Sequence, residues 1–235
     1  MKGKILFILF FNFAFSSKSQ NNKTTFGLQY KPIIPTAYFN NSDINKKSND
    51  YTFNLKPKYS NSFGMVIRNQ INKTFSIESG LNYIQRNFKL SITNSSINLQ
   101  DFTVFSMRSY EFPIQLLTYV RASENWYLNI AFGFSHNVLA SDIKSSGLEV
   151  DKFFQNTYRK SGGYSALLAN LGMEYRTENR GCYYFGTSLH RPWEAISRIY
   201  PEYDDKLNIF NDDREFFLEM LGNFVTIDFR YFFAE

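Results

Sequence analysis

Alternation of two unlike kinds of residue at every second position is the feature that most constrains the fold of this chain. In the segment 126–135, large apolar side chains occupy the even positions from Trp126 to Phe134, and smaller or more polar ones occupy the odd positions. A strict period of two indicates a β-strand whose two faces meet different surroundings. The same alternation recurs at 26–31, 62–68, 75–84, 111–121, 167–176, 182–190 and 225–233. The sequence therefore predicts eight strands.

The connections between these predicted strands alternate in length. Tight turns are expected at 70–73, 122–125 and 177–180, and long polar loops at 40–50, 91–101, 141–162 and 192–213. An up-and-down meander places odd and even connections at opposite ends, and outer-membrane barrels combine short periplasmic turns with long external loops and an even strand number. A Greek-key sandwich would not sort its loops in this way. We therefore expect an all-β fold, an eight-stranded antiparallel up-and-down transmembrane β-barrel.

The large apolar face of each predicted strand is expected to contact lipid. Several of these faces cover nine residues, for example Phe75–Tyr83 and Trp126–Phe134, and a tilted strand needs about 9–11 residues to cross the apolar layer. Aromatic side chains favour the boundary between membrane and water. The aromatic residues predicted at the boundary on the short-turn side are Phe75, Trp126, Tyr175, Tyr183, Tyr231 and Phe233.

The opposite faces of the predicted strands combine small residues with charges of both signs. Small residues suit the crowded interior of an eight-stranded barrel, which its own side chains just fill. Charges enclosed there must pair, because an unpaired charge in a low-dielectric interior is strongly destabilising. We predict a lumenal charge network that plugs the barrel, formed by Glu78, Arg86, Glu111, Glu174, Arg176, Asp228 and Arg230.

The first residues read as a secretory signal peptide. Lys2 and Lys4 precede an apolar run at 5–15, which small and polar residues follow. This order is typical of a cleaved signal, and the run is too short to span a membrane as a helix. We expect a signal peptide at 1–19, a barrel domain at 20–235, and export to the cell outer membrane.

Composition narrows the remaining function classes. Aromatic residues make up 19% of the chain although its mean hydropathy is −0.34, a combination unusual for a soluble domain. Its single cysteine, Cys182, excludes an intramolecular disulfide framework and a CxxC metal site. The formal net charge of +5 comes from scattered lysines and arginines, which does not indicate a nucleic-acid partner.

Several of the alternating segments resemble a known group of proteins. They are "IESGLNYIQRNF" (77–88), "YEFPIQLLTYVR" (110–121), "YLNIAFGFS" (127–135) and the aromatic-rich C-terminal strand. With the signal peptide, they resemble the outer-membrane β-barrel domain proteins of Bacteroidota, and the PorT-like family in particular. The resemblance implies an integral outer-membrane protein, and PorT itself is linked to type IX secretion. The ending "RYFFAE" departs from the terminal aromatic residue common in such proteins.

Candidate catalytic residues are few. Ser188 and His190 share one face of a predicted strand, and Ser135 precedes His136. A serine nucleophile needs a base within hydrogen-bond reach and a third group that orients the base, and no partner carboxylate can be assigned from the sequence. Two histidines and one cysteine on different strands have no metal-ligand spacing. We therefore expect no enzymatic activity, no metal and no cofactor.

The expected function is structural or interactive. The chain would be a barrel with a plugged lumen that serves as an accessory subunit of an envelope or secretion complex and acts through its external loops or its wall. Its partners would be outer-membrane lipid and one or more proteins, with no small-molecule substrate evident. Two alternatives remain open at this point: a lipid-modifying outer-membrane enzyme that uses a Ser/His pair, and a soluble lipocalin-like carrier.

Overall fold

The computed structural model describes residues 23–34, 44–48, 50–147, 152–203 and 216–234. The predicted signal peptide lies outside these residues. The described strands are β1 (Thr24–Ile34), β2 (Ile44–Ser48), β3 (Tyr51–Gln70), β4 (Phe75–Asn94), β5 (Leu99–Arg121), β6 (Trp126–Leu139), β7 (Ile143–Ser146), β8 (Phe153–Arg159), β9 (Gly163–Arg176), β10 (Cys182–Pro192), β11 (Ala195–Tyr203), β12 (Leu218–Leu221) and β13 (Phe224–Phe232).

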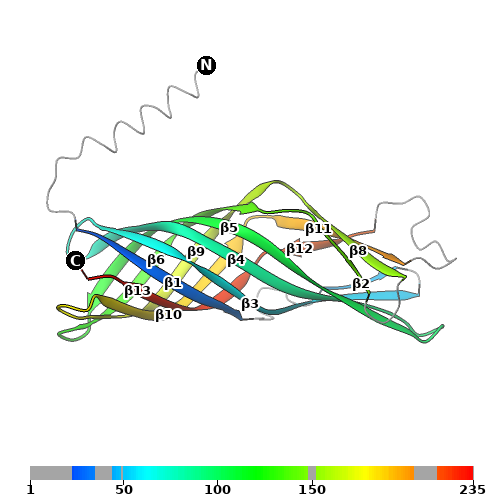
Figure 1. Ribbon diagram of the computed structural model, residues 1–235, viewed down its shortest axis with the longest axis horizontal. Helices are drawn as coiled ribbons and strands as arrows, with labels where there is room; N and C mark the ends of the chain where they lie inside the picture. Colours follow the sequence, from blue (N-terminus) through cyan, green and yellow to red (C-terminus); the bar gives the residue numbers. More distant parts are fainter. Residues whose placement is uncertain (1–22, 35–43, 49, 148–151, 204–215, 235) are drawn as a thin grey trace, which may run out of the picture.

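Eight of these strands form a closed antiparallel barrel. Their order around the ring is β1-β3-β4-β5-β6-β9-β10-β13, and pairing of β1 with both β3 and β13 closes it. Each of the eight predicted strands coincides with one of these eight, apart from Phe233, which lies just beyond the end of β13, so the predicted up-and-down barrel is confirmed. The start of β1, the end of β13 and the tight turns lie together at one end of an elongated cylinder (Figure 1).

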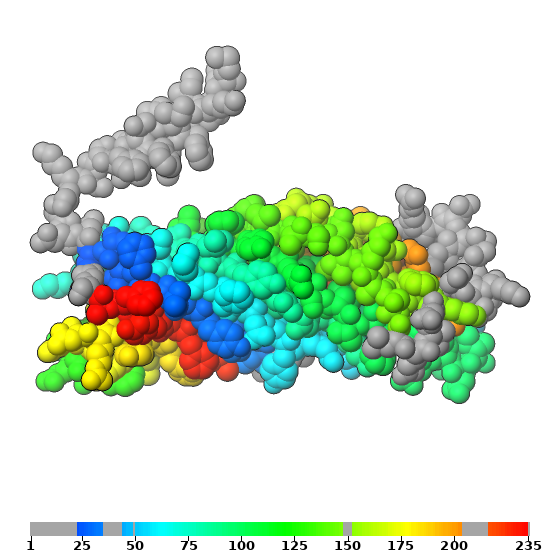
Figure 2. Space-filling model, viewed as in Figure 1, coloured from blue at the N-terminus to red at the C-terminus, as the bar shows by residue number. Residues whose placement is uncertain are grey.

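At the other end, three strands of the barrel continue into an extension. β3, β4 and β5 are 20, 20 and 23 residues long, and β2 pairs with the far part of β3. Opposite them lies a second sheet in the order β12-β11-β8-β7. We call β2, the far halves of β3–β5 and this second sheet the extension. It makes up the right-hand part of the long cylinder in Figure 2.

The extension shows that the long connections were only partly predicted. The segment 91–101 is not a loop throughout, because β4 runs to Asn94, β5 begins at Leu99, and only a turn separates them. The other three predicted loops contain described strands, namely β2, then β7 and β8, then β11. Polar residues alternate with inward apolar ones in these segments, for example around Ile92 in 91–101 and Ile199 in 192–213. The polarity of the segments therefore reflects one solvated face of a strand rather than an irregular backbone.

The inward face of a single strand changes its character between barrel and extension. On β4 the even-numbered side chains point inward along the whole strand. In the barrel they include Glu78 and Asn82, whereas in the extension they include Leu90 and Ile92, and all four are buried. The extension therefore has an ordinary apolar core, while the barrel has a polar interior and an apolar exterior.

A β-bulge adapts β3 to both parts. The register between β3 and β4 shifts between Lys58 and Asn61. Before the shift the odd-numbered Phe53 and Leu55 are buried, and after it the even-numbered Ser60 and Ser62 are buried. The extra residue thus moves the inward face from odd to even positions, and it allows Phe53 to join the core of the extension while Arg68 reaches the lumen.

Candidate functional site

Charged side chains cross the lumen in the half of the barrel nearest the tight turns. Arg68 Nη1 of β3 donates to Glu174 Oε2 of β9 at 2.7 Å, and Arg68 Nη2 donates to Glu78 Oε1 of β4 at 3.0 Å. Arg230 Nη1 of β13 donates to Glu78 Oε2 at 2.7 Å. All four residues are at most 7% exposed. They join strands from opposite sides of the barrel through charge-assisted hydrogen bonds.

Asp228 extends this network toward the centre of the barrel. Its Oδ2 accepts from Arg230 Nη2 at 2.8 Å and from Ser188 Oγ at 2.5 Å, while its Oδ1 accepts from Thr226 Oγ1 at 2.5 Å. Lys31 Nζ lies 3.9 Å from Asp228 Oδ2. Each carboxylate oxygen therefore has a partner, as a buried charge requires.

Arg176 connects the network to the short-turn opening. Its Nε donates to Glu174 Oε1 at 2.6 Å, and its guanidinium carbon lies 4.0 Å from the centre of the Tyr127 ring. The side chain of Arg176 is 34% exposed, against 1% for Glu174. The network thus begins at a partly exposed side chain and is fully buried at its next member, Glu174.

The two remaining predicted residues belong to a second group, nearer the extension. His190 Nδ1 lies 3.0 Å from Glu111 Oε1, and Asn82 Nδ2 donates to Glu111 Oε2 at 2.8 Å. Arg86 donates to the carbonyl oxygen of Gly222 at 3.0 Å. Of the seven predicted residues, the structure bonds Arg230 directly to Glu78 and Asp228, and Arg176 directly to Glu174. Arg68 links these two sets, and Glu111 and Arg86 lie apart from them.

Sequence reasoning missed three lumenal residues that carry much of this geometry, namely Arg68, Lys31 and His190. Arg68 and Lys31 lie at alternate positions that share a strand face with Ser62 and Gln29, both of which are buried, so the period of two contains the signal needed to find them. The sequence offers His190 as a candidate catalytic base, whereas the structure places it against Glu111 and stacks it on the ring of Phe224, with centroids 4.3 Å apart.

Aromatic side chains fill the remaining lumenal space around the charges. Tyr184 projects inward over two glycines, and a Cβ atom added to either Gly172 or Gly186 would lie 2.2 Å from its hydroxyl oxygen. Tyr184 donates to Asn170 Oδ1 at 2.7 Å. The Arg68 guanidinium carbon lies 3.7 Å from the centre of the Phe232 ring. The small residues therefore make room for rings that cross the lumen.

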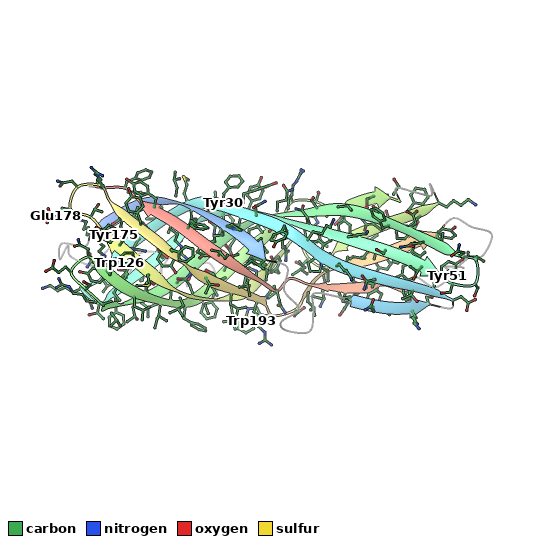
Figure 3. All side chains as sticks on the ribbon, turned by 90° about the horizontal axis from the view of Figure 1, so that it is seen from below. Tyr30, Tyr51, Trp126, Tyr175, Glu178 and Trp193 are labelled. Carbon is green, nitrogen blue, oxygen red and sulfur yellow. The ribbon has the colours of Figure 1, made fainter. Side chains whose placement is uncertain are left out.

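The predicted boundary aromatics lie on the outward side near the tight turns. Trp126 and Tyr175 pack with ring centroids 4.9 Å apart, close to Glu178 at the end of the cylinder (Figure 3). Tyr231 packs against Tyr183 at 5.1 Å and against Phe233 at 5.4 Å. Phe75 is 39% exposed at the start of β4.

The structure separates both predicted Ser/His pairs. Ser188 bonds to Asp228, whereas His190 lies against Glu111. Ser135 is buried in the lumen, whereas its neighbour His136 is exposed on the outer side. His136 Nδ1 instead lies 3.3 Å from Ser165 Oγ. Among the described residues, no carboxylate bonded to His136 provides the third group that a catalytic triad needs.

No group of three or more metal-binding side chains occurs within the part of the chain that the structure describes. Among the same residues, no helix is long and apolar enough to cross a membrane, and this finding concerns helices only.

In this closed eight-stranded barrel, aromatic and aliphatic side chains face outward and paired charges face inward. This combination defines the outer-membrane type of β-barrel. The comparison with solved structures agrees with this fold class. The chain is similar to the outer membrane protein OprG from Pseudomonas aeruginosa, with a TM-score of 0.51 and 9% sequence identity over 91% of this chain and 98% of that one. No family model and no curated protein matches the sequence.

Proposed function

We propose that this protein is an integral outer-membrane β-barrel with a closed lumen that acts as a structural or accessory subunit of the cell envelope. The observation that carries the proposal is the inverted polarity of the ring. Outward side chains such as Ile114 and Phe132 are 63% and 58% exposed, whereas inward Glu78 and Asp228 are at most 2% exposed. Such a surface is stable in lipid and would aggregate in water.

The extension is the part of the molecule that we propose to contact other envelope components. It projects from the end of the barrel opposite the tight turns (Figure 1), which in barrels of this type is the external end. Its core is apolar, with Phe53, Leu90 and Ile199 fully buried between its two layers. A packed external module of this kind supports a role in a complex, as the resemblance to PorT-like proteins of Bacteroidota implies.

We also propose that the barrel is not an enzyme. Ser188 is bonded to Asp228 and His190 lies against Glu111, and no carboxylate among the described residues is bonded to the outward Ser165–His136 pair. Phospholipase and lipid A deacylase assays on the purified barrel should therefore give the background rate. Activity that disappears in Ser165→Ala or His136→Ala would overturn this part of the proposal.

Membrane fractionation with gel mobility tests the main proposal. The protein should remain in the outer-membrane fraction after carbonate washing, and its unboiled form should migrate differently from the boiled form. A protein released in soluble form without detergent would contradict the barrel function and favour a lipocalin-like carrier.

Two further measurements address the closed lumen and the complex. Purified protein in planar bilayers should give no stable channels, since Arg68, Glu78 and Glu174 cross the lumen. Large stable conductances would exclude the closed state. Purification from native membranes in mild detergent, followed by mass spectrometry, should recover specific partner proteins, and variants in the extension should lose them.

A further inference from the structure

All the carboxylates on three neighbouring strands of the barrel point inward. β3, β4 and β5 contain only Glu78, Asp101 and Glu111 as acidic residues, and each is at most 4% exposed. The outward faces of these strands therefore carry no negative side chain over their whole length.

The outward charges of the same strands are positive and are concentrated in the extension. Lys56, Lys58 and Arg108 are exposed and Lys89 is partly exposed. Lys56 lies directly opposite Lys89 in the pairing of β3 with β4, and Lys89 Nζ lies 3.6 Å from the centre of the Phe102 ring. Lys47 of β2 lies on the same face, opposite outward Thr52. We call Lys47, Lys56, Lys58, Lys89 and Arg108 the cationic face.

The other wall of the extension is built differently. There, surface cations lie beside carboxylates: Arg159 Nε is 3.0 Å from Asp142, Lys160 Nζ is 2.8 Å from Glu194, and Arg198 Nε is 3.6 Å from Glu219. Three surface cations of this wall therefore have a carboxylate partner, whereas the outward faces of β3, β4 and β5 carry no carboxylate.

The cationic face begins where the lipid-facing surface ends. Phe63, Tyr83 and Tyr110 form a continuous row of outward rings on β3, β4 and β5, with centroids 5.2 and 5.8 Å apart. Arg108 is two residues beyond Tyr110 and Lys89 is six residues beyond Tyr83. At about 3.3 Å per residue, these cations lie about 7 and about 20 Å farther along their strands.

We propose that the cationic face binds the phosphate-bearing headgroup of the outer-leaflet glycolipid. This inference rests on the proposed function, because the face must lie above an external lipid surface. Arg108 and Lys58 would meet phosphates next to the acyl chains, and Lys56 and Lys89 would meet anionic groups farther out. Lysine and arginine both recognise phosphate well.

Titration of the detergent-solubilised barrel with purified lipopolysaccharide tests this proposal. Because one cation near an anionic membrane surface strengthens binding about fivefold, the variant Lys58→Gln/Lys89→Gln/Arg108→Gln should bind about a hundredfold more weakly. The matched control is Arg159→Gln/Lys160→Gln/Arg198→Gln on the other wall, which should change the affinity less than about twofold because exposed pairs contribute little. The three single glutamine variants provide the same test if the triple variant does not fold.

The ligand series identifies the source of the phosphate. Enzymatically dephosphorylated lipopolysaccharide and phosphatidylglycerol should both bind more weakly than the phosphorylated glycolipid. Unchanged binding by the cationic-face variant, or equal binding of the three ligands, would overturn the proposal. Heat-modifiable gel mobility of each sample distinguishes failure of the proposed function from failure of this inference. A wild-type protein that does not form a membrane barrel refutes both proposals. An intact barrel whose lipid binding does not depend on phosphate refutes only this one.

Discussion

Arg68 of β3 and Glu174 of β9 are 106 residues apart in sequence, yet their side chains meet across the lumen with Nη1 2.7 Å from Oε2. Arg68 also bonds to Glu78, and it lies over the Phe232 ring. One buried guanidinium therefore links strands from both sides of the ring. Its contacts make it the residue on which the lumenal network depends most directly.

Removing this guanidinium should destabilise the barrel strongly. Arg68→Leu leaves Glu78 and Glu174 with fewer partners in a buried site, and loss of one member of a buried pair costs about 3–5 kcal/mol. Urea unfolding of the vesicle-inserted protein measures the change. Arg121→Leu is the control, because Arg121 is exposed and bonds to the turn carbonyls of Ser123 and Glu124, and it should shift stability by less than about 0.5 kcal/mol. Equal stability of Arg68→Leu and wild type would show that the network contributes nothing to folding.

Close packing of Tyr184 on Gly172 predicts a coupled pair of substitutions. Gly172→Ala places a methyl group against the Tyr184 hydroxyl and the carbonyl oxygen of Phe185, and overpacking of this kind costs about 1–3 kcal/mol. Tyr184→Phe removes the hydroxyl, so the double variant should lose less stability than the sum of the two single variants. Unfolding free energies in a double-mutant cycle give the coupling. Strict additivity would argue against the contact.

Local alternation was sufficient to predict the barrel but not the contacts inside it. A period of two assigns Glu78 and Asp228 to one face from their immediate neighbours alone, and both are buried in the lumen. Which charges meet depends on strand order, register and barrel closure, which bring Arg68 to Glu174. The extension was missed for a related reason. Its inward residues, such as Phe53 and Ile92, lie in segments rich in Asn, Ser and Lys, and the bulge in β3 interrupts the alternation there.

Asp142, which lies outside the membrane-spanning segments, should titrate below the usual range. Its Oδ1 accepts from the backbone N–H and from the Nε of Arg159, both at 3.0 Å. These bonds hold the pKa of the Asp142 carboxyl below its ordinary value, with the backbone bond the larger favourable cause. Because this pKa is depressed on folding, the contribution of the contact is present above the unfolded pKa and is lost as the pH falls through the folded one.

An NMR titration of the folded protein measures this pKa directly. Arg159→Gln should move it upward, though only in part, because the backbone donor remains. Lys160→Gln, which removes the neighbouring partner of Glu194, should leave it in place. An Asp142 carboxyl that titrates at its ordinary value in the wild type would contradict the structure of this segment.

Because the polarity is inverted between barrel and extension, an outward lysine should destabilise the barrel but not the extension, even on the same sheet. Ile114, in the barrel, and Thr93, in the extension, both face outward and are exposed. Ile114→Lys places a charge in lipid and should cost about 2–4 kcal/mol near the midplane, whereas Thr93→Lys stays in water and should be neutral.

Ile92 is the inward neighbour of Thr93 and is fully buried. Ile92→Lys should disrupt the extension core while the barrel remains inserted. Vesicle insertion, read from unboiled gel mobility, and proteolysis of the extension separate these outcomes. Equal insertion of Ile114→Lys and Thr93→Lys would mean that both surfaces meet the same solvent. That result would contradict the assignment of the outward apolar side chains of the barrel to lipid.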